Sequence, residues 1–327
     1  MGYKIMKKRL AAVIAICVLL LSACRGGSEG ALRGNELLSV DGSVCSWAEA
    51  QIYILSQHAI YSKTYGEDIW RVKLQDGDFE SYIKDALMNY LKLLFLAEYG
   101  AKKKGVSLSE AEEKEIAQAA SAYAGSLDEK TRLKTGITEK VAQDAFKRFT
   151  LAQIFHRQVM QDAGREISDD QARVISVEMV KSGQEAGYEQ AREILSKLEE
   201  GKSVDEAIRG LKGVEHQKMN LMRGQYSEGF EKIVFALKAE QWSPIITEGG
   251  GYYLVKCLSP YLEEETIKNK AERELALREE ELNRTLEDYA GSVQLLYNPA
   301  LWDGWDMSQY ADLSQVSFFD YTEQLRK

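Results

Sequence analysis

Two stretches of helical periodicity, separated by a segment of a different kind, constrain the fold of this chain most. Between Phe79 and Tyr99 apolar residues recur every three or four positions, which is typical of an amphipathic helix with a wide buried face. The same spacing returns between Glu263 and Tyr289, where one apolar stripe needs a partner surface that the N-terminal helices can supply. That stripe consists of Ile267, Ala271, Leu275, Leu282, Leu286 and Tyr289. The pattern predicts a helical domain interrupted by an inserted module.

Composition supports a mainly helical globular protein. The 327 residues correspond to about two domains of roughly 150 residues each. Only 3 residues are proline, whereas 45% are hydrophobic, which excludes a proline-rich or disordered chain. The net charge of -9 argues against a nucleic-acid partner, because phosphate binding needs a basic surface.

The first 23 residues read as a secretory signal. Four basic residues precede the apolar run AAVIAICVLLLSA, which is too short to remain as a membrane span. The segment Leu21-Ser22-Ala23-Cys24 resembles a bacterial lipobox, and this resemblance implies cleavage before Cys24 and lipid attachment to it. The alternative is an ordinary signal with an incidental cysteine. Removal of residues 1–23 changes the net charge from -9 to -13, because they carry four positive and no negative charges. The predicted location is extracytoplasmic, with residues 24–36 as lipidated cysteine and tether.

The remaining cysteines and the histidines give no sign of metal chemistry. Cys45 and Cys257 would be the thiols of the mature chain, and burial as small apolar residues is favoured over a disulfide between them. His58, His156 and His216 are far apart, and the chain has no CxxC pair. We therefore expect no metal and no cofactor.

Turn and cap signals mark several elements outside the central segment. Leu37 to Val44, with Asp41-Gly42 at its centre, predicts a hairpin, and Ser46 predicts a cap for the helix that follows. Ser109 with Glu112 forms a predicted capping box. The strand-like Val293 to Tyr297 could pair with the hairpin near Val40.

Between Ile167 and Ser259 the pattern is that of an α+β module. Val174 to Val180 and Tyr252 to Cys257 are strand candidates. Helices are predicted at Ala191 to Leu198, ending at Gly201, at Val204 to Ile208, and at Phe230 to Leu237.

The order of these pieces resembles the PrsA and SurA foldases, extracytoplasmic chaperones whose helical domain is interrupted by a parvulin-type peptidyl-prolyl isomerase domain. The matching pieces are Met179-Val180-Lys181, Phe230-Glu231, Phe235-Ala236-Leu237, Ser243-Pro244-Ile245-Ile246-Thr247 and Gly251 to Lys256. The resemblance implies an α+β fold in which N- and C-terminal segments form the chaperone domain. The implied parts are residues 37–165 and 261–327 for the chaperone domain and residues 166–260 for the parvulin-like domain.

The departures from the family concern its proline pocket. The two histidines that face each other in active parvulins are replaced by Val177 and Tyr253, and a methionine is replaced by Tyr226. The family's loop with an acidic residue or cysteine is shortened to Gly210 to Gly224, without a counterpart for that residue. Phe230 and Phe235 are kept, either as pocket walls or as core residues.

The resemblance implies a lipid-anchored chaperone that holds unfolded secreted polypeptides, with a weak or silent isomerase domain. Its helical surface would bind extended apolar segments. No covalent step is needed to rotate a prolyl bond, so an apolar pocket alone could retain some activity. The alternatives are a fully active isomerase and a substrate-specific assembly factor or structural lipoprotein.

Overall fold

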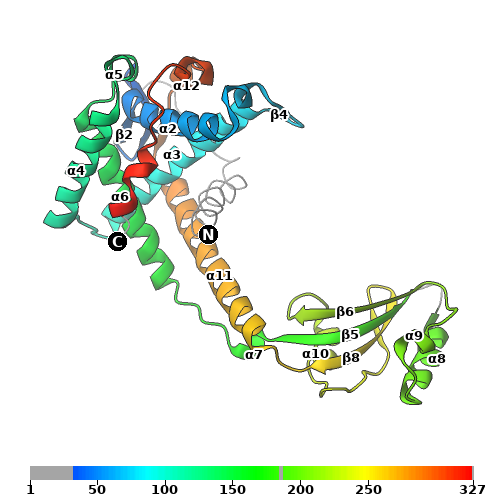
Figure 1. The fold of residues 1–327 in the computed structure, drawn as a ribbon. Coiled ribbons are helices and arrows are strands. Elements are labelled where there is room, and N and C mark those ends of the chain that lie inside the picture. Colours follow the sequence, from blue (N-terminus) through cyan, green and yellow to red (C-terminus); the bar gives the residue numbers. More distant parts are fainter. Residues whose placement is uncertain (1–31, 184–186, 326–327) are drawn as a thin grey trace. The chain divides into compact units, whose positions relative to one another are not determined.

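The computed structural model describes residues 32–183 and 187–325, so the predicted signal peptide and Cys24 lie outside the described residues. Internal contacts divide the chain into two compact units. The helical unit contains the described residues up to Asp162 and those from Glu280 onward, and the sheet unit runs from Ala163 to Glu279. Figure 1 shows helices in both units, and the second unit contains a four-stranded sheet. The predicted α+β class is confirmed.

Polar caps start most helices of the helical unit. The Ser46 hydroxyl accepts a hydrogen bond from the Glu49 amide at the start of α2, and Ser109 and Glu112 form the predicted capping box of α4. The α-helices are α2 (Trp47–Tyr65), α3 (Phe79–Lys103), α4 (Glu110–Ser126), α5 (Glu129–Thr135), α6 (Glu139–Asp162), the second part of α11 (Glu263–Ser292) and α12 (Pro299–Asp303). Short 3-10 helices are η2 (Glu67–Arg71), η4 (Met307–Tyr310), η5 (Phe318–Tyr321) and η6 (Glu323–Leu325).

A small antiparallel sheet joins the two ends of the helical unit. Strands β1 (Glu36–Val40) and β2 (Ser43–Ser46) form the predicted hairpin, with Asp41 and Gly42 at positive φ in the turn. Strand β9 (Leu295–Tyr297) pairs with β1 so that Leu295 lies opposite Val40, as predicted. A two-stranded hairpin, β3 (Lys73–Leu74) and β4 (Gly77–Asp78), lies between η2 and α3.

Aromatic packing fills the core of this unit. The rings of Phe146 and Phe318 stack with centroids 4.1 Å apart, and Tyr53 contacts Phe318 edge-on at 5.4 Å. Gly100 in α3 lies directly against other aromatic rings, since a Cβ there would come within 2.5 Å of Phe155 and 2.8 Å of Tyr289. The C-terminal segment therefore contributes Phe318 and Tyr289 to the same core as the N-terminal helices.

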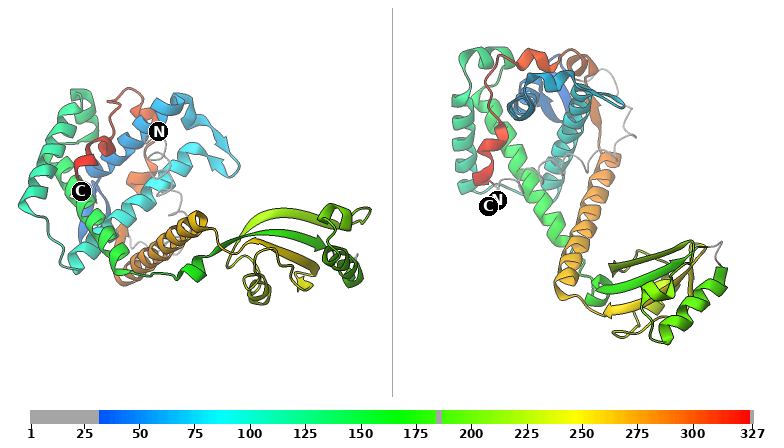
Figure 2. Two further views of the ribbon diagram at one scale, coloured as in Figure 1. Left: turned by 60° about the horizontal axis from the view of Figure 1, so that its bottom comes forward. Right: turned by 45° about the vertical axis from the view of Figure 1, so that its right-hand side comes forward.

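The sheet unit, drawn from two further sides in Figure 2, contains four antiparallel strands in the order β6-β5-β8-β7. The strands are β5 (Val174–Ser182), β6 (Val214–Met222), β7 (Ile246–Glu248) and β8 (Gly251–Ser259), and the helices are α7 (Asp169–Ala172), α8 (Gly187–Glu199), α9 (Val204–Ala207) and α10 (Glu228–Val234). Side chains alternate between two apolar clusters, with Val177 and Met179 in one and Val180 in the other.

The expectation that Gly210 to Gly224 is a loop is wrong, because this segment contains the nine-residue strand β6. Its sequence, VEHQKMNLM, is mostly polar and has few of the β-branched residues that usually indicate a strand. A polar composition suits β6 because it lies at the edge of the sheet.

Helix α11 is shared by the two units, whereas we expected it to belong to the helical domain alone. Its first part is tied to the sheet unit: the Thr266 hydroxyl accepts a hydrogen bond from the Val174 amide at 3.0 Å, and the Asn269 amide donates to the Ala172 carbonyl at 2.7 Å. The unit boundary therefore falls at Glu279, inside the helix, and not after residue 260.

The apolar stripe of α11 is only partly covered, which corrects the expectation that the N-terminal helices cover the stripe. Leu286 is buried, and Leu282 and Tyr289 pack against the core of the helical unit. Ile267 and Leu275, in the part that lies within the sheet unit, are 61% and 48% exposed.

Candidate functional site

The structure brings the five predicted pocket residues together. Val177 on β5, Tyr253 on β8, Phe230 on α10, Phe235 just after α10 and Tyr226 in the preceding turn all belong to one apolar cluster. We call it the aromatic cluster. Val177, Phe230 and Phe235 are buried, whereas Tyr226 and Tyr253 are half-buried and form its accessible edge.

The rings of Tyr226 and Tyr253 cover Phe230 at the accessible edge of the aromatic cluster. Tyr226 stacks on Phe230 with centroids 4.3 Å apart, and Tyr253 meets Phe230 edge-on at 5.6 Å. Phe230 is only 1% exposed, so the tyrosine rings cover the residue that would form a pocket wall. Burial raises the pKa of the Tyr226 hydroxyl, which therefore stays protonated near neutral pH.

Glu231 positions the turn that carries Tyr226, and sequence reasoning gave this residue no role. One carboxylate oxygen, Oε1, accepts hydrogen bonds from the amides of Gly224, Gln225 and Tyr226 at 2.6, 3.0 and 3.1 Å. Glu231 is buried, and a buried carboxylate requires such donors. The sequence places Glu231 beside the kept Phe230, but α10 also contains Glu228 and Lys232, so the sequence alone does not mark Glu231 as the buried charge.

The sheet unit holds its single histidine outside the aromatic cluster. His216 on β6 bonds to the carboxylate of Glu178 at 2.9 Å. Glu178 lies between Val177 and Met179 on β5, so its side chain points to the opposite face of the sheet. Among the described residues of the sheet unit, no imidazole therefore takes the place of the two that Val177 and Tyr253 replace.

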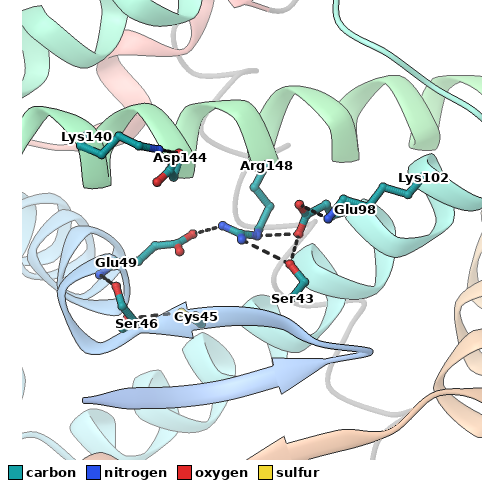
Figure 3. Close-up of polar contacts among 9 residues, drawn as sticks. All are labelled: Ser43, Cys45, Ser46, Glu49, Glu98, Lys102, Lys140, Asp144 and Arg148. Carbon is teal, nitrogen blue, oxygen red and sulfur yellow. Dashed lines mark hydrogen bonds and ion pairs between the residues drawn. The ribbon is translucent and has the colours of Figure 1, made fainter. Parts of the chain in front are cut away.

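Figure 3 shows a buried ion network in the helical unit. Its members Glu49, Glu98 and Arg148 also line a recess of about 540 Å³. The Arg148 guanidinium on α6 pairs with Glu49 on α2 and, at 2.8 Å, with Glu98 on α3. Glu98 also accepts hydrogen bonds from Ser43 and Lys102, each at 2.8 Å. The network thus connects β2, α2, α3 and α6, and these charges are paired with one another.

Burial sets the protonation of this network. It raises the pKa of Glu49 to about 7, although Arg148 opposes the shift. The pKa of Glu98 is lowered, because Arg148, Lys102 and Ser43 together outweigh its burial. Sequence reasoning missed these residues, although Arg148 stands between Phe146 and Phe149 on the apolar face of its helix, an unusual place for a cation.

Cys45 and Cys257, the two cysteines among the described residues, are buried and free. Burial raises the pKa of both thiols, which disfavours the reactive thiolate. Within residues 32–183 and 187–325 there is no cluster of three or more acidic, histidine or cysteine side chains suited to a metal ion. None of the helices in this part of the chain is long and apolar enough to cross a membrane.

Comparisons with known proteins identify structural neighbours only. No protein-family model and no curated protein matches this chain. It is similar to the peptidylprolyl isomerase PrsA of Bacillus anthracis, with 18% sequence identity and a TM-score of 0.30, over 61% of this chain and 96% of that one.

Further structural neighbours are a PrsA foldase and a SurA-like chaperone. For the foldase protein PrsA of Streptococcus pneumoniae the identity is 16%, the TM-score 0.29, and the coverage 85% of this chain and 100% of that one. Another neighbour is a structure described with the SurA-like chaperones PEB4 and Cj1289 of Campylobacter jejuni. The sequence identity is 11% and the TM-score is 0.24, and the match covers 80% of this chain and 98% of that one. Because these identities and TM-scores are low, we derive the function of the chain from its own residues.

Proposed function

We propose that this chain is an extracytoplasmic foldase, anchored to the membrane by lipid on Cys24, that holds unfolded secreted polypeptides. Its sheet unit would be a parvulin-like module with weak or no prolyl isomerase activity. The observation that carries the proposal is a group of exposed apolar side chains on the helical unit. We call it the apolar corner, and it consists of Tyr65, Val72, Leu74 and Tyr82.

The members of the apolar corner are exposed and close in sequence, and a row of rings connects two of them, Tyr65 and Tyr82. Its four members are between 41% and 65% exposed and fall within 18 residues of sequence. Ring contacts connect Tyr65 to Tyr61 at 6.3 Å, Tyr61 to Phe79 at 5.1 Å, and Phe79 to Tyr82 at 6.5 Å. Contiguous exposed apolar surface typically marks an interaction site. A surface of aromatic rings suits apolar segments of many sequences, as a foldase requires.

The aromatic cluster supports the second half of the proposal. Isomerisation requires a pocket that desolvates the prolyl bond, and the tyrosine rings that cover Phe230 leave a shallow apolar edge in its place. Val177 and Tyr253 supply no imidazole pair to orient the polar groups of the substrate.

The test is suppression of aggregation of a chemically denatured client by the soluble form that starts at Arg25. We expect the double variant Tyr65→Ser, Tyr82→Ser to require several-fold more protein for the same suppression, because each substitution removes apolar contact area. The matched control is Leu133→Ser, since Leu133 is 79% exposed but lies outside the corner. Equal loss in both variants, or no suppression by the parent, would contradict the proposal.

A protease-coupled assay on a proline peptide tests the isomerase half. We expect turnover well below that of an active parvulin, and any residual turnover to be lost in Phe230→Ala. Circular dichroism must show that this variant still folds, because truncation of a buried phenylalanine costs about 3–5 kcal/mol. Turnover equal to an active parvulin would instead support the fully active isomerase.

A further inference from the structure

The outer edge of β6 is an unpaired strand edge nine residues long. β6 stands at the end of the order β6-β5-β8-β7 and pairs with β5 from Val214 to Met222. No other described strand pairs with its outer side. Such an edge presents backbone donors and acceptors in a regular row, which another extended chain can satisfy.

The hydrogen bonds at one end of β6 show which residues present that row. The Met222 amide donates to the Gln225 side chain at 2.9 Å, so it is not paired with β5. Opposite it, the amide and carbonyl of Val174 bond to Thr266 and Leu262. Met222 and Val174 are therefore a non-hydrogen-bonded pair of the ladder.

Because such pairs alternate along an antiparallel ladder, every second residue of β6 turns its backbone outward. Together with Met222, these residues are Val214, His216, Lys218 and Asn220. The other end agrees, since the Gly213 carbonyl bonds inward to the Gly183 amide at 3.1 Å.

The two faces of β6 differ in chemistry. Met219 and Leu221 point into the aromatic cluster, where Met219 is only partly buried. Lys218 and His216 point to the other face beside Glu178, and the Lys218 side chain is 63% exposed. A strand added to this edge would place alternate side chains next to Met219 and next to Lys218.

We infer that the outer edge of β6 binds an extended segment of an unfolded polypeptide as a fifth strand of the sheet. The segment has apolar residues on the face of the aromatic cluster and polar or acidic residues on the face of Lys218. Main-chain hydrogen bonds supply affinity with little demand on sequence, which suits a protein with many clients. The inference rests on the proposed foldase function.

A second copy of this chain fits the edge poorly. Antiparallel self-pairing over the full strand places Val214 opposite Met222 and therefore Lys218 opposite the same lysine of the other copy. Like charges directly opposed are destabilising in a sheet. Lysine at an edge is a common protection against such association.

Hydrogen exchange at single-residue resolution tests the inference on the soluble chain that starts at Arg25. The probe is a nine-residue peptide in which valine alternates with threonine and one central threonine is replaced by glutamate. At saturating peptide, we expect the amides of His216, Lys218 and Asn220 to exchange on the order of tenfold more slowly. The amides of Gln217 and Met219, already paired with β5, should change little.

The peptide control separates backbone pairing from apolar contact. The same peptide N-methylated at two neighbouring central residues keeps its side chains but loses a donor on each edge. We expect it to give no protection of β6. Equal protection by both peptides, or no alternation along β6, would overturn the inference.

Two variants test the edge from the protein side. Lys218→Pro removes an outward amide without removing a bond to β5, and proline is tolerated at such edge positions. We expect it to weaken peptide binding about tenfold, as for the loss of one good hydrogen bond. Lys218→Ala keeps the amide and should cost about fivefold at most, as for an exposed charge.

The outcomes distinguish this inference from the proposed function. If Lys218→Pro does not fold, the exchange pattern of the parent chain decides alone. If the parent suppresses aggregation but β6 shows no alternating protection, the edge inference fails and the foldase function stands. If the parent suppresses no aggregation, the proposed foldase function is wrong, and the inference that rests on it is wrong as well.

Discussion

At the scale of single residues, Gly100 shows how tightly the helical unit is packed. A methyl group there would meet the rings of Phe155 and Tyr289 at 2.5 to 2.8 Å. Alanine improves helix propensity by about 1 kcal/mol, whereas overpacking a core costs about 1–3 kcal/mol. Because Phe155 is fully buried and cannot move aside easily, we expect the packing cost to exceed the gain in helix propensity, so that Gly100→Ala lowers the free energy of unfolding in urea by about 1–2 kcal/mol.

The control for that prediction is another helical glycine. Gly125 in α4 is exposed, and a Cβ there would meet nothing within 4 Å. Gly125→Ala should therefore raise the free energy of unfolding, by up to about 1 kcal/mol, through helix propensity alone. Destabilisation by both substitutions would show that the aromatic contacts are not the cause.

Glu49 should make the stability of the helical unit depend on pH. Its pKa is about 7 in the folded chain and 4.5 ordinarily, so between these values the folded state holds a proton that the unfolded state has lost. The free energy of unfolding should therefore fall as pH rises from about 5 to 8, by at most about 3 kcal/mol. Glu98, whose pKa is lowered, acts in the opposite sense but only below about pH 4.5.

Urea unfolding followed by tryptophan fluorescence measures this dependence, since Trp47, Trp70, Trp302 and Trp305 all belong to the helical unit. Glu49→Gln keeps an oxygen for Arg148 but cannot titrate, so its unfolding free energy should vary much less over the same range. The same slope in parent and variant would assign the titration to another group.

The residues of the aromatic cluster illustrate what a sequence can reveal at this scale. Val177, Tyr226, Phe230 and Tyr253 could be named from their positions in a pattern. The stacking of Tyr226 over Phe230 could not, because it depends on three amides bonded to Glu231 across a turn. Contacts between residues far apart in sequence, such as Arg148 with Glu49, leave only an indirect sign in the periodicity.

At the scale of elements, the first part of α11 should stabilise the sheet unit. Asn269 satisfies the buried carbonyl of Ala172, and loss of such a partner costs about 1–3 kcal/mol. We expect Asn269→Ala to lower the unfolding free energy of the sheet unit by that amount. A fluorescence melt that reports Trp242, with the other tryptophans replaced by phenylalanine, measures it.

The matched control is Asn220→Ala on the exposed edge of β6, which should stay within about 0.5 kcal/mol of the parent. An equal effect of both substitutions, or a fragment of residues 163–260 as stable as one of residues 163–279, would show that α11 contributes nothing there.

Elements with strong local signals were predictable, and those defined by distant contacts were not. The hairpin at Asp41-Gly42 and the caps at Ser46 and Ser109 follow from local chemistry, and all three are confirmed. β6 was missed because its register is fixed by nine pairs with β5 rather than by its own residues. The division of α11 depends on hydrogen bonds to α7 and β5, which its periodicity does not encode.

At the scale of the whole molecule, charge and anchoring belong together in the proposed function. The proposed cleavage before Cys24 would leave a chain with a net charge of -13, which has little electrostatic attraction to anionic lipid or nucleic acid. Attachment to the membrane would therefore have to come from a specific anchor. The predicted tether of residues 24–36 overlaps the described chain only from residue 32, and its last residue, Glu36, is the first residue of β1.

Cys24→Ala should therefore release the protein from the membrane when the full chain is expressed in a bacterium that processes lipoproteins. We expect the parent to enter the detergent phase of a Triton X-114 partition and the variant to leave it, because lipid with two or more acyl chains anchors stably. Cys17→Ala is the matched control, since Cys17 lies inside the apolar run and should be removed with it. If Cys24→Ala stays in the detergent phase, the apolar run itself is retained as an anchor. If parent and both variants are all found in the aqueous phase, the chain carries an ordinary cleaved signal, and its clients must then be met away from the membrane.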